Sequence, residues 1–375
     1  MKVVVTDYDM LTAYGHGIQA CWDGLLSGRS ALREVERLNI SSCRCKLGGS
    51  VAGIESMASH SASYQLIDLL FSDKKNPVPE GAPLLLATTN GEVDLIERSV
   101  FEGREDYQCG ALSGFLNKVC QRLDARWGAE IISSACISST AAVARAASMI
   151  RSGEHDACIV VRCDALTEFV FSGFSSLMAL DEKGAHPFDA NRRGLCLGEG
   201  AAYAVLMSEE RALREGSEVR GEVAGWGLSN DANHMTGPSR DGSGLARAIA
   251  IALRLSGIEQ DQVSSICAHG TGTQYNDAME MLAFKKIFSN CRPVYSIKGG
   301  TGHTMGAAGV IELLILLKSL ESGIAPPTLG LMDVDEVAAG WVSTCEASLK
   351  EGWALTSNSG FGGVNAALIV GKGVV

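Results

Sequence analysis

Short apolar runs alternate with longer amphipathic segments along almost all of this chain, and this alternation constrains the fold more than any other feature. Expected strands lie at residues 3–5, 84–88, 130–134, 157–162, 201–207, 218–226, 263–268, 293–297, 341–344 and 366–370. Expected helices lie at residues 18–26, 110–122, 137–151, 244–255, 277–288 and 305–320. Such alternation predicts an α/β protein with buried sheets.

Two segments share a pattern that suggests an internal duplication. Residues 130–153 run from a strand through Cys136 into a helix of small residues. Residues 293–323 run from a strand through Lys298 and His303 into a similar helix. Any two strand–helix units share part of this pattern, so duplication stays open on these grounds. We predict two halves, residues 1–208 and 209–375, joined at the charged helical segment 209–215.

Composition narrows the class of protein. The chain has 375 residues, of which 46% are hydrophobic, and no apolar run has the length of a membrane span. Without a signal-peptide pattern at its start, it is expected to be soluble and cytoplasmic. Its net charge of −11 argues against nucleic acid or an anionic membrane as a partner.

The twelve cysteines form no regular framework, which indicates reduced thiols. Cys43 and Cys45 resemble half of a metal site, but no second pair with zinc-like spacing accompanies them, and no metal is predicted. Cys136 differs because it lies among small residues at a strand-to-helix junction. A helix N-terminus lowers the pKa of a thiol there, although many buried cysteines only pack.

Two histidines lie in similarly tight, glycine-rich settings. His269 begins His-Gly-Thr-Gly-Thr, and His303 lies in Gly-His-Thr-Met-Gly. A lone histidine after a strand is more often a core residue than a catalyst. Two of them, together with Cys136, outline an active site with a cysteine nucleophile.

Charged and aromatic residues nearby are candidate supports. Asp277 and Glu280 share one face of an expected helix. Lys298 is expected to be buried and to need a carboxylate partner, for which we predict Glu280; an ordinary salt bridge is the alternative. Phe361, within the glycine-rich segment 358–365, is interpreted either as a movable gate over a pocket or as part of a tight turn.

Taken in order, these segments closely resemble the β-ketoacyl-[acyl-carrier-protein] synthases, specifically the elongating, decarboxylating class with a Cys-His-His site. The matching motifs are Ser-Ala-Cys136, Pro187-Phe-Asp-Ala-Asn-Arg-Arg-Gly, Gly198-Glu199-Gly-Ala, His269-Gly-Thr-Gly-Thr with Asn276-Asp277, Ser296-Ile-Lys298, Gly302-His303 to Gly309, and Asn358 to Asn365. They span nearly the whole chain. The chain-priming class has asparagine where this chain has His303, so it fits less well.

The resemblance implies a thiolase-like fold with two duplicated halves in a layered αβαβα arrangement. It also implies that Cys136 attacks an acyl thioester, with the backbone amides of Cys136 and Phe361 forming the oxyanion hole. His269 and His303 would donate hydrogen bonds to a malonyl-type thioester and stabilise the enolate formed as carbon dioxide leaves. The reaction would be a decarboxylative condensation in fatty acid or polyketide synthesis.

Supporting roles are implied as well. Lys298 with Glu280 would set the orientation and charge of the histidines, and Thr271 and Thr273 would contact the pantetheine arm. The motifs also place Asp277 and Glu199 as supporting residues. Neither a metal nor a redox cofactor is expected, because the substrates are carried on the phosphopantetheine of an acyl carrier protein.

The implied partners are an acyl carrier protein and a second subunit, in a homodimer or in a heterodimer with a ketosynthase-like chain. An acidic carrier needs a basic surface, so Lys118, Arg122 and Arg126 are candidates for one basic helical face; a solvated helix face is an equally good interpretation. Arg192 and Arg193 are a second candidate.

Three departures from the family pattern predict a specialised product such as a polyene. Residues 90–129 are shortened, residues 6–10 lack the usual glycines, and Ser359 replaces a phenylalanine. Two alternative functions were weighed. A chain-length-factor-like subunit would usually lack Cys136, and a non-condensing acyltransferase would not need both histidines.

Overall fold

The computed structural model describes residues 1–56, 58–72, 76–104 and 106–373. One large mixed sheet runs through the molecule. Its strands are β1 Val3–Thr12, β2 Gly15–His16, β5 Leu84–Ala87, β6 Ala129–Ile132, β7 Ala157–Asp164, β9 Gly200–Ser208, β10 Gly221–Asn230, β11 Val263–Cys267, β12 Val294–Tyr295, β15 Trp353–Gly360 and β16 Val364–Lys372.

The strand order shows that the chain contains the same unit twice. The N-terminal strands lie in the order β1-β9-β7-β5-β6, and the C-terminal strands lie in the order β10-β16-β15-β11-β12. In both sets the first two pairings are antiparallel and the last two are parallel. The two units meet where β1 pairs with β10. The duplicated α/β fold that the resemblance implied is therefore confirmed.

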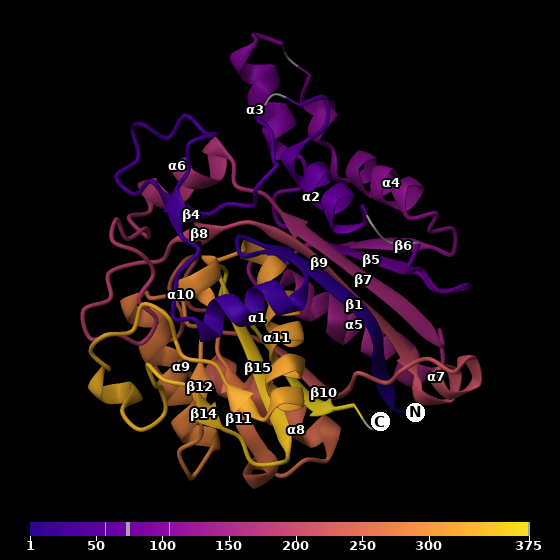
Figure 1. Ribbon diagram of the computed structural model, residues 1–375, viewed down its shortest axis with the longest axis vertical. Helices are drawn as coiled ribbons and strands as arrows, with labels where there is room; N and C mark the ends of the chain where they lie inside the picture. Colours follow the sequence, from indigo (N-terminus) through magenta and orange to yellow (C-terminus); the bar gives the residue numbers. More distant parts are fainter. Residues whose placement is uncertain (57, 73–75, 105, 374–375) are drawn as a thin grey trace.

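Helices form three layers around the two halves of the sheet (Figure 1). Helices α5 Ser138–Ser152 and α11 Ala308–Ser322 pack against each other between the halves and form the central apolar core. The outer face of the N-terminal half is covered by α2 Ala62–Leu70 and α4 Leu112–Arg122. The outer face of the C-terminal half is covered by α8 Ser243–Ser256 and α9 Gln274–Ile287.

A single glycine brings the two central helices together. A Cβ atom at Gly309, in the first turn of α11, would lie 2.0 Å from Thr140 Oγ1 in the first turn of α5. No side chain fits in that space, so glycine is required for this close approach. The contact draws the residues that precede both helices, including Cys136 and His303, toward one point.

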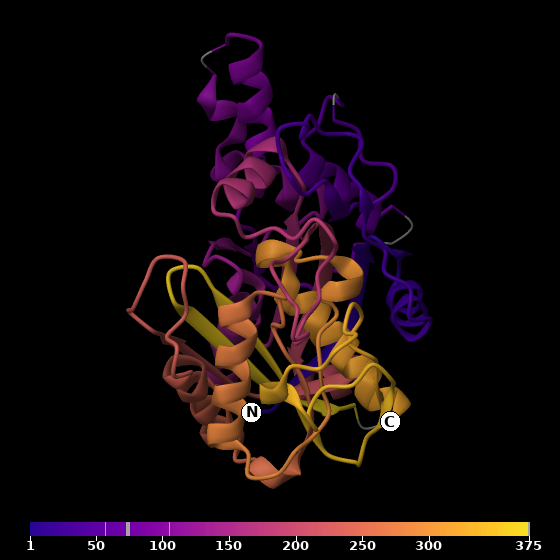
Figure 2. The same ribbon diagram turned by 90° about the vertical axis from the view of Figure 1, so that its left-hand side faces the viewer.

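The remaining elements lie around this body. They are α1 Ile18–Leu26, α3 Val93–Phe101, α6 Glu168–Ser176, α7 Glu209–Glu215, α10 Lys298–Thr301, β3 Arg33–Glu34, β4 Leu47–Gly49, β8 Leu197–Gly198, β13 Ile324–Ala325, β14 Ala347–Ser348, and the short turns η1 Tyr107–Gly110, η2 Gln260–Gln262, η3 Met305–Ala307 and η4 Glu336–Ala338. The α3 region projects from the body, as Figure 2 shows. Among the described residues, no helix is long and apolar enough to cross a membrane.

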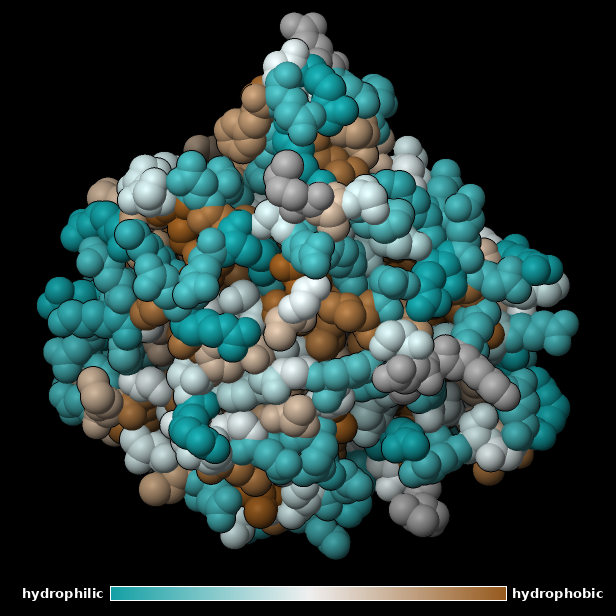
Figure 3. All heavy atoms as spheres, turned by 45° about the horizontal axis from the view of Figure 1, so that its top comes forward, coloured by the Kyte–Doolittle hydropathy of each residue, from teal (hydrophilic) through white to brown (hydrophobic). Residues whose placement is uncertain are grey.

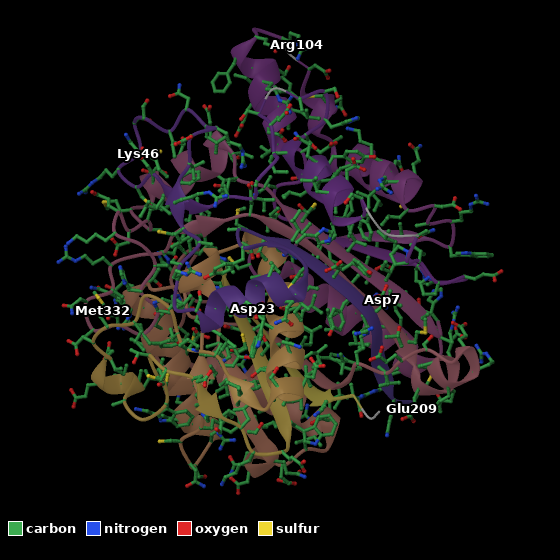
Figure 4. The ribbon with its side chains drawn as sticks, viewed as in Figure 1. Asp7, Asp23, Lys46, Arg104, Glu209 and Met332 are labelled. Atoms are coloured by element: carbon green, nitrogen blue, oxygen red, sulfur yellow. The ribbon has the colours of Figure 1, made fainter. Side chains whose placement is uncertain are left out.

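A short charged helix lies between the last strand of the first unit and the first strand of the second. Helix α7 Glu209–Glu215 joins β9 to β10 at the margin of the molecule, where Figure 4 shows Glu209. Glu209 pairs with Lys2 at 3.3 Å, so α7 lies beside the N-terminus. Lys46 and Met332 lie at the opposite margin of the same view.

Two sequence-based assignments were wrong. Residues 341–344 form no strand, and only Val342 makes an isolated bridge, to Val294. The central strand β15 was missed because its second half, Thr356 to Ser359, is polar although buried. Residues 358–365, interpreted as a glycine loop, form the end of β15, a turn and the start of β16.

Candidate active site

The structure brings Cys136, His269 and His303 together at the junction of the two halves. Cys136 lies between β6 and α5, His269 follows β11, and His303 lies between α10 and α11. The sulfur and one nitrogen of each ring lie within 4.8 Å of one another, and His303 Nε2 is 3.1 Å from Cys136 Sγ. All three side chains are buried. Ala135, directly before the cysteine, has a φ of 45°, an uncommon conformation for alanine that turns the chain into the site.

Burial dominates the acidity of the Cys136 thiol. Lys298 and the backbone amides of Phe361 and Cys136 stabilise the thiolate, but loss of solvent raises the thiol pKa to about 11. The net shift is thus opposite to that expected from the helix N-terminus alone. The two amides nevertheless both face the sulfur, as an oxyanion hole at this position requires.

A high pKa makes alkylation of Cys136 strongly pH-dependent. Below the pKa the thiolate fraction rises with pH, so we expect the rate with iodoacetamide to rise roughly tenfold per pH unit between pH 7 and 9. Mass spectrometry of the Cys136 peptide at timed intervals measures this rate. A plateau below pH 9 would contradict the expectation, because it would show that the thiolate is already formed.

Hydrogen bonds fix the tautomer of each histidine. His269 Nδ1 lies 3.2 Å from both Lys298 Nζ and Asn358 Nδ2. His303 Nδ1 accepts from the backbone amide of Met305 at 3.2 Å. Because these groups donate to Nδ1, the ring proton of each histidine lies on Nε2. Burial and the nearby Lys298 charge hold the pKa of both histidines well below its usual value, so both rings are neutral N–H donors.

The same tautomers decide what the three groups can bind. Their separation would allow a metal ion to bridge them. A metal, however, needs bare imidazole nitrogens and a thiolate. Here each Nδ1 is already bonded to a donor, and each Nε2 carries a proton. The arrangement is therefore suited to holding a developing oxyanion rather than a cation.

Lys298 pairs with Glu312, and the predicted pairing with Glu280 was wrong. Lys298 Nζ forms a buried ion pair with Glu312 Oε1 and donates to the carbonyl oxygen of His269 at 2.5 Å. Glu280 instead accepts from the amides of His269 and Gly270, each at 2.7 Å. Glu280 and Glu312 both lie near Lys298, but only Glu312, on α11, contacts its ammonium group. Burial, together with the neighbouring Asp277, raises the pKa of Glu280 to about 8.

Three residues of this hydrogen-bonded cluster were not singled out from the sequence. Glu312 and Asn358 are buried and bonded to each other at 2.6 Å, and Thr140 donates to the Asn358 side chain. Glu312 had a visible signal, since it is the only charged residue in the apolar segment 310–317. Asn358 begins the matching motif 358–365, but no role was assigned to it because its strand was not recognised.

A cavity of about 620 Å³ leads to the three reactive groups. Its wall includes Thr271 and Thr273, whose hydroxyl oxygens are 2.9 Å apart. Asp277 supports this loop by accepting from the amide of Thr271 at 3.0 Å. Phe361 also lines the cavity and stacks on Phe174 with ring centroids 5.6 Å apart. The predicted gate thus lies in the cavity wall.

Glu199 lies next to the segment that bonds to the backbone of His303. It is fully buried, pairs with Arg37 at 2.5 Å, and accepts from the backbone amides of Val51 and Leu166. Strand β8 directly precedes Glu199, and its Gly198 amide donates to the carbonyl oxygen of His303 at 2.9 Å. Glu199 is therefore connected to His303 through the backbone of Gly198.

The predicted basic helical face is wrong in part. Helix α4 ends at Arg122, so Arg126 lies beyond it. Lys118, Arg122 and Arg126 are paired with Glu92, Asp68 and Asp124, respectively. None of the three basic residues lines the cavity.

Two other arginines lie at the cavity. Arg193 and Arg240 are exposed, line it, and make no ion pair with any described residue. Arg240 lies over the ring of Tyr275, 5.4 Å from its centroid. Arg192, in contrast, is buried and paired with Asp335.

Comparisons with known proteins identify the family of this chain. Residues 101–212 match the family described as "Beta-ketoacyl synthase, N-terminal domain", and residues 220–332 match "Beta-ketoacyl synthase, C-terminal domain". The "3-oxoacyl-[acyl-carrier-protein] synthase 2" of Vibrio harveyi is 31% identical over 410 aligned positions, covering 99% of this chain and 98% of that protein. The chain belongs to the β-ketoacyl synthase family.

Further relatives of this β-ketoacyl synthase carry the names of ketosynthases. The "Tetracenomycin polyketide synthase ketoacyl synthase alpha subunit" of Streptomyces glaucescens is 29% identical over 413 positions, covering 99% of this chain and 97% of that protein. A solved structure entitled "The ishigamide ketosynthase/chain length factor" superposes with a TM-score of 0.90 at 28% identity, covering 99% of both chains. The synthase has fewer residues than these alignments have positions, so it carries deletions relative to its relatives.

Proposed function

We propose that this synthase transfers an acyl chain from a carrier thioester to Cys136 and condenses it with malonyl-[acyl-carrier-protein]. In the first step the Cys136 sulfur attacks the thioester carbonyl, and the carrier thiol leaves with a proton. In the second step malonyl thioester loses carbon dioxide, and the resulting enolate carbon attacks the acyl-Cys136 carbonyl. The Cys136 thiolate leaves and regains a proton, and β-ketoacyl thioester is released.

One observation carries this proposal: a thiol and two neutral N–H donors converge at the end of one cavity. His303 Nε2 lies 3.1 Å from Cys136 Sγ, and the Nε2 proton of His269 is directed away from Lys298 and Asn358. Loss of carbon dioxide places negative charge on the thioester oxygen. Two fixed, neutral donors stabilise that charge without any reorganisation.

Other residues take roles that follow from their contacts. The amides of Cys136 and Phe361 hold the carbonyl oxygen of the acyl group, since both already face the sulfur. Thr271 and Thr273 contact the pantetheine arm along the cavity wall. Glu280 and Asp277 hold the His269 loop. No step needs a metal or redox cofactor, because every charge that develops has a hydrogen-bond donor of the protein beside it.

We place the carrier protein at the cavity rim, where Arg193 and Arg240 present unpaired positive charge. Replacing both by glutamate is expected to lower kcat/KM for carrier-bound substrates roughly tenfold at low salt, and the loss should shrink as salt screens the charges. Thioesters of pantetheine alone should react as before. Steady-state rates with both substrate types measure the effect.

Two single substitutions make this test specific. Arg254→Glu makes one such replacement at an exposed residue of α8, outside the cavity, and should leave both substrate types unaffected. Arg126→Glu tests the surface first predicted from the sequence. Selective loss of activity with carrier substrates in Arg126→Glu, with none in the Arg193 and Arg240 variant, would move the docking site to the surface around Arg126, beyond the end of α4.

We also propose that the synthase acts as a dimer and in the cytoplasm. Two structures whose titles name a ketosynthase and a chain length factor superpose on this chain. One of them, from Xenorhabdus doucetiae, has a TM-score of 0.84 at 26% identity and covers 99% of this chain and 98% of that one.

Strand β6 lies at the end of the strand order and pairs, among described strands, only with β5. Apolar residues are exposed near α3 and η1, including Phe101 and Tyr107, and Figure 3 shows apolar side chains at the base of this projection. A free sheet edge and exposed apolar side chains both suit a second subunit. The proposal of a cytoplasmic location rests on the twelve free thiols, which suit a reducing compartment.

Acylation and carbon dioxide release, followed together, test the proposed function. The purified protein is incubated with acyl-[acyl-carrier-protein] and malonyl-[acyl-carrier-protein], and mass spectrometry follows the Cys136 peptide and the β-ketoacyl product. The expected result is an acyl adduct on Cys136 that disappears as product forms. Absence of the adduct with every chain length would overturn the proposal, and an adduct without condensation would favour a non-condensing acyltransferase.

A further inference from the structure

Asn358 is a buried residue whose side chain connects four separate segments of the site. Its Nδ2 atom donates to Glu312 Oε2 on α11 at 2.6 Å and lies 3.2 Å from His269 Nδ1 after β11. Its Oδ1 atom accepts from the hydroxyl of Thr140 on α5. Asn358 itself lies near the end of β15 and is fully buried. Both amide protons and the carbonyl oxygen are therefore in use.

The orientation of this amide follows from the chemistry of its neighbours. Glu312 is ion-paired with Lys298, and a carboxylate only accepts hydrogen bonds, so the NH₂ group of Asn358 must face it. The second proton of the same group then points to His269 Nδ1. The hydroxyl of Thr140 completes the arrangement by donating to the carbonyl oxygen.

Lys298 can direct only one proton to the His269 ring, at Nδ1. Its ammonium group has three protons, and two are directed to Glu312 and to the His269 carbonyl oxygen. Asn358 adds a second donor at Nδ1, and it also holds the Glu312 oxygen that Lys298 does not contact. The amide thus acts on the ring directly and on the ion pair beside it.

We propose that Asn358, oriented by Thr140, is a positioning residue that keeps the proton of His269 on Nε2 for decarboxylation. This inference rests on the proposed function, in which His269 donates from Nε2 to the malonyl thioester. It separates the two half-reactions, because acylation of Cys136 needs the thiol and the oxyanion hole and does not need that donor.

The substitution Asn358→Asp keeps the shape of the side chain and replaces its two donors by a carboxyl group. When this carboxyl is ionised it accepts a proton from Nδ1–H, so it favours the wrong tautomer and repels Glu312. We expect malonyl decarboxylation to fall about 10- to 100-fold, as for loss of one hydrogen bond at a charged or reacting group. Acylation of Cys136 should change less than threefold. Relative to the wild type, decarboxylation should recover as the pH falls and the carboxyl becomes a donor again.

A matched pair of threonine substitutions controls for packing. Thr140→Val removes the hydroxyl that orients Asn358 and should lower decarboxylation in the same direction, by less. Thr356→Val makes the same change on β15, two residues before Asn358, where the buried hydroxyl has no hydrogen-bond partner among the described residues. It should leave decarboxylation, acylation and the pH profile unchanged. Equal losses in both half-reactions for Asn358→Asp and Thr140→Val, with no pH-dependent recovery, would overturn the proposal.

The tautomer itself gives a readout independent of activity. In ¹⁵N-histidine-labelled protein, long-range ¹H–¹⁵N spectra distinguish protonated from bare ring nitrogens, and a His269→Gln variant assigns the signal among the seven histidines. We expect Nε2–H for His269 in the wild type and in Thr356→Val, and a shift toward Nδ1–H in Asn358→Asp. An unchanged tautomer in Asn358→Asp would overturn the inference. A wild type that shows this tautomer but neither acylation nor decarboxylation would overturn the proposed function alone.

Discussion

Replacing Cys136 by alanine is expected to abolish covalent acylation and to lower condensation by about 10⁴-fold or more, because no other group takes over from a deleted nucleophile. Cys136 lies at the end of the cavity, within reach of the two amides and of His303. The mass of the intact protein after incubation with an acyl thioester, together with product formation from malonyl-[acyl-carrier-protein], measures both effects. Cys345→Ala serves as the control, since that exposed thiol lies outside this cavity.

A glutamine at the same position separates the half-reactions. The carboxamide of Cys136→Gln resembles an acyl thioester and can place its oxygen at the amides of residues 136 and 361. We expect this variant to lose acyl transfer entirely and to retain or increase malonyl decarboxylation, which depends on His269 and His303. Inactivity of a folded Cys136→Gln protein in both assays would contradict this division of roles.

Breaking the Lys298–Glu312 pair is expected to cost both activity and stability. Each side chain is 1% exposed, so removing either one leaves a buried charge without its partner. Such losses destabilise a protein by about 3–5 kcal/mol. Decarboxylation should fall about 10²- to 10³-fold in Lys298→Ala, because the ring of His269 loses its charged donor. Urea unfolding and carbon dioxide release measure the two effects.

Double-variant cycles identify which carboxylate is the partner. Lys298→Ala combined with Glu312→Ala should show a coupling of about 1–3 kcal/mol, as residues in direct contact do. The same cycle with Glu280→Ala should show less, because Glu280 holds the amides of His269 and Gly270 and makes no hydrogen bond to Lys298. A larger coupling to Glu280 would restore the pairing first expected from the sequence.

Much of the fold and the three reactive residues could be predicted from the sequence, and the failures have physical causes. Small residues around Cys136 and glycines around His269 and His303 indicate places where two backbone segments approach closely. This signal lies within a short stretch of sequence, so it can be recognised without the structure. The partner of Lys298 was assigned wrongly because pairing depends on how helices are layered. From the sequence, Glu280 and Glu312 are equally good candidate partners for Lys298. Only the position of α11 between the two halves of the sheet decides in favour of Glu312.

Strand β15 shows a second limit. Its residues Thr356 to Ser359 are polar, so hydropathy points to a loop, yet the strand is central and buried. Among its polar groups, Asn358 is bonded within the site, whereas the hydroxyl of Thr356 has no partner. A sequence pattern cannot separate these two cases, because the distinction depends on what three other elements place opposite each side chain.

The repeated strand order has a consequence for how the chemistry is divided. Symmetry would allow an equivalent loop after β5 and after β11, but the two have diverged. The loop after β11 carries His269, whereas the loop after β5 carries Thr88, Thr89 and Asn90, which all bond to the buried Asp164. In the proposed reaction the first copy of the unit supplies the nucleophile, and the second supplies both imidazole donors. The two copies have thus diverged, and the proposed site needs residues of both, so we expect neither half to carry the reaction alone.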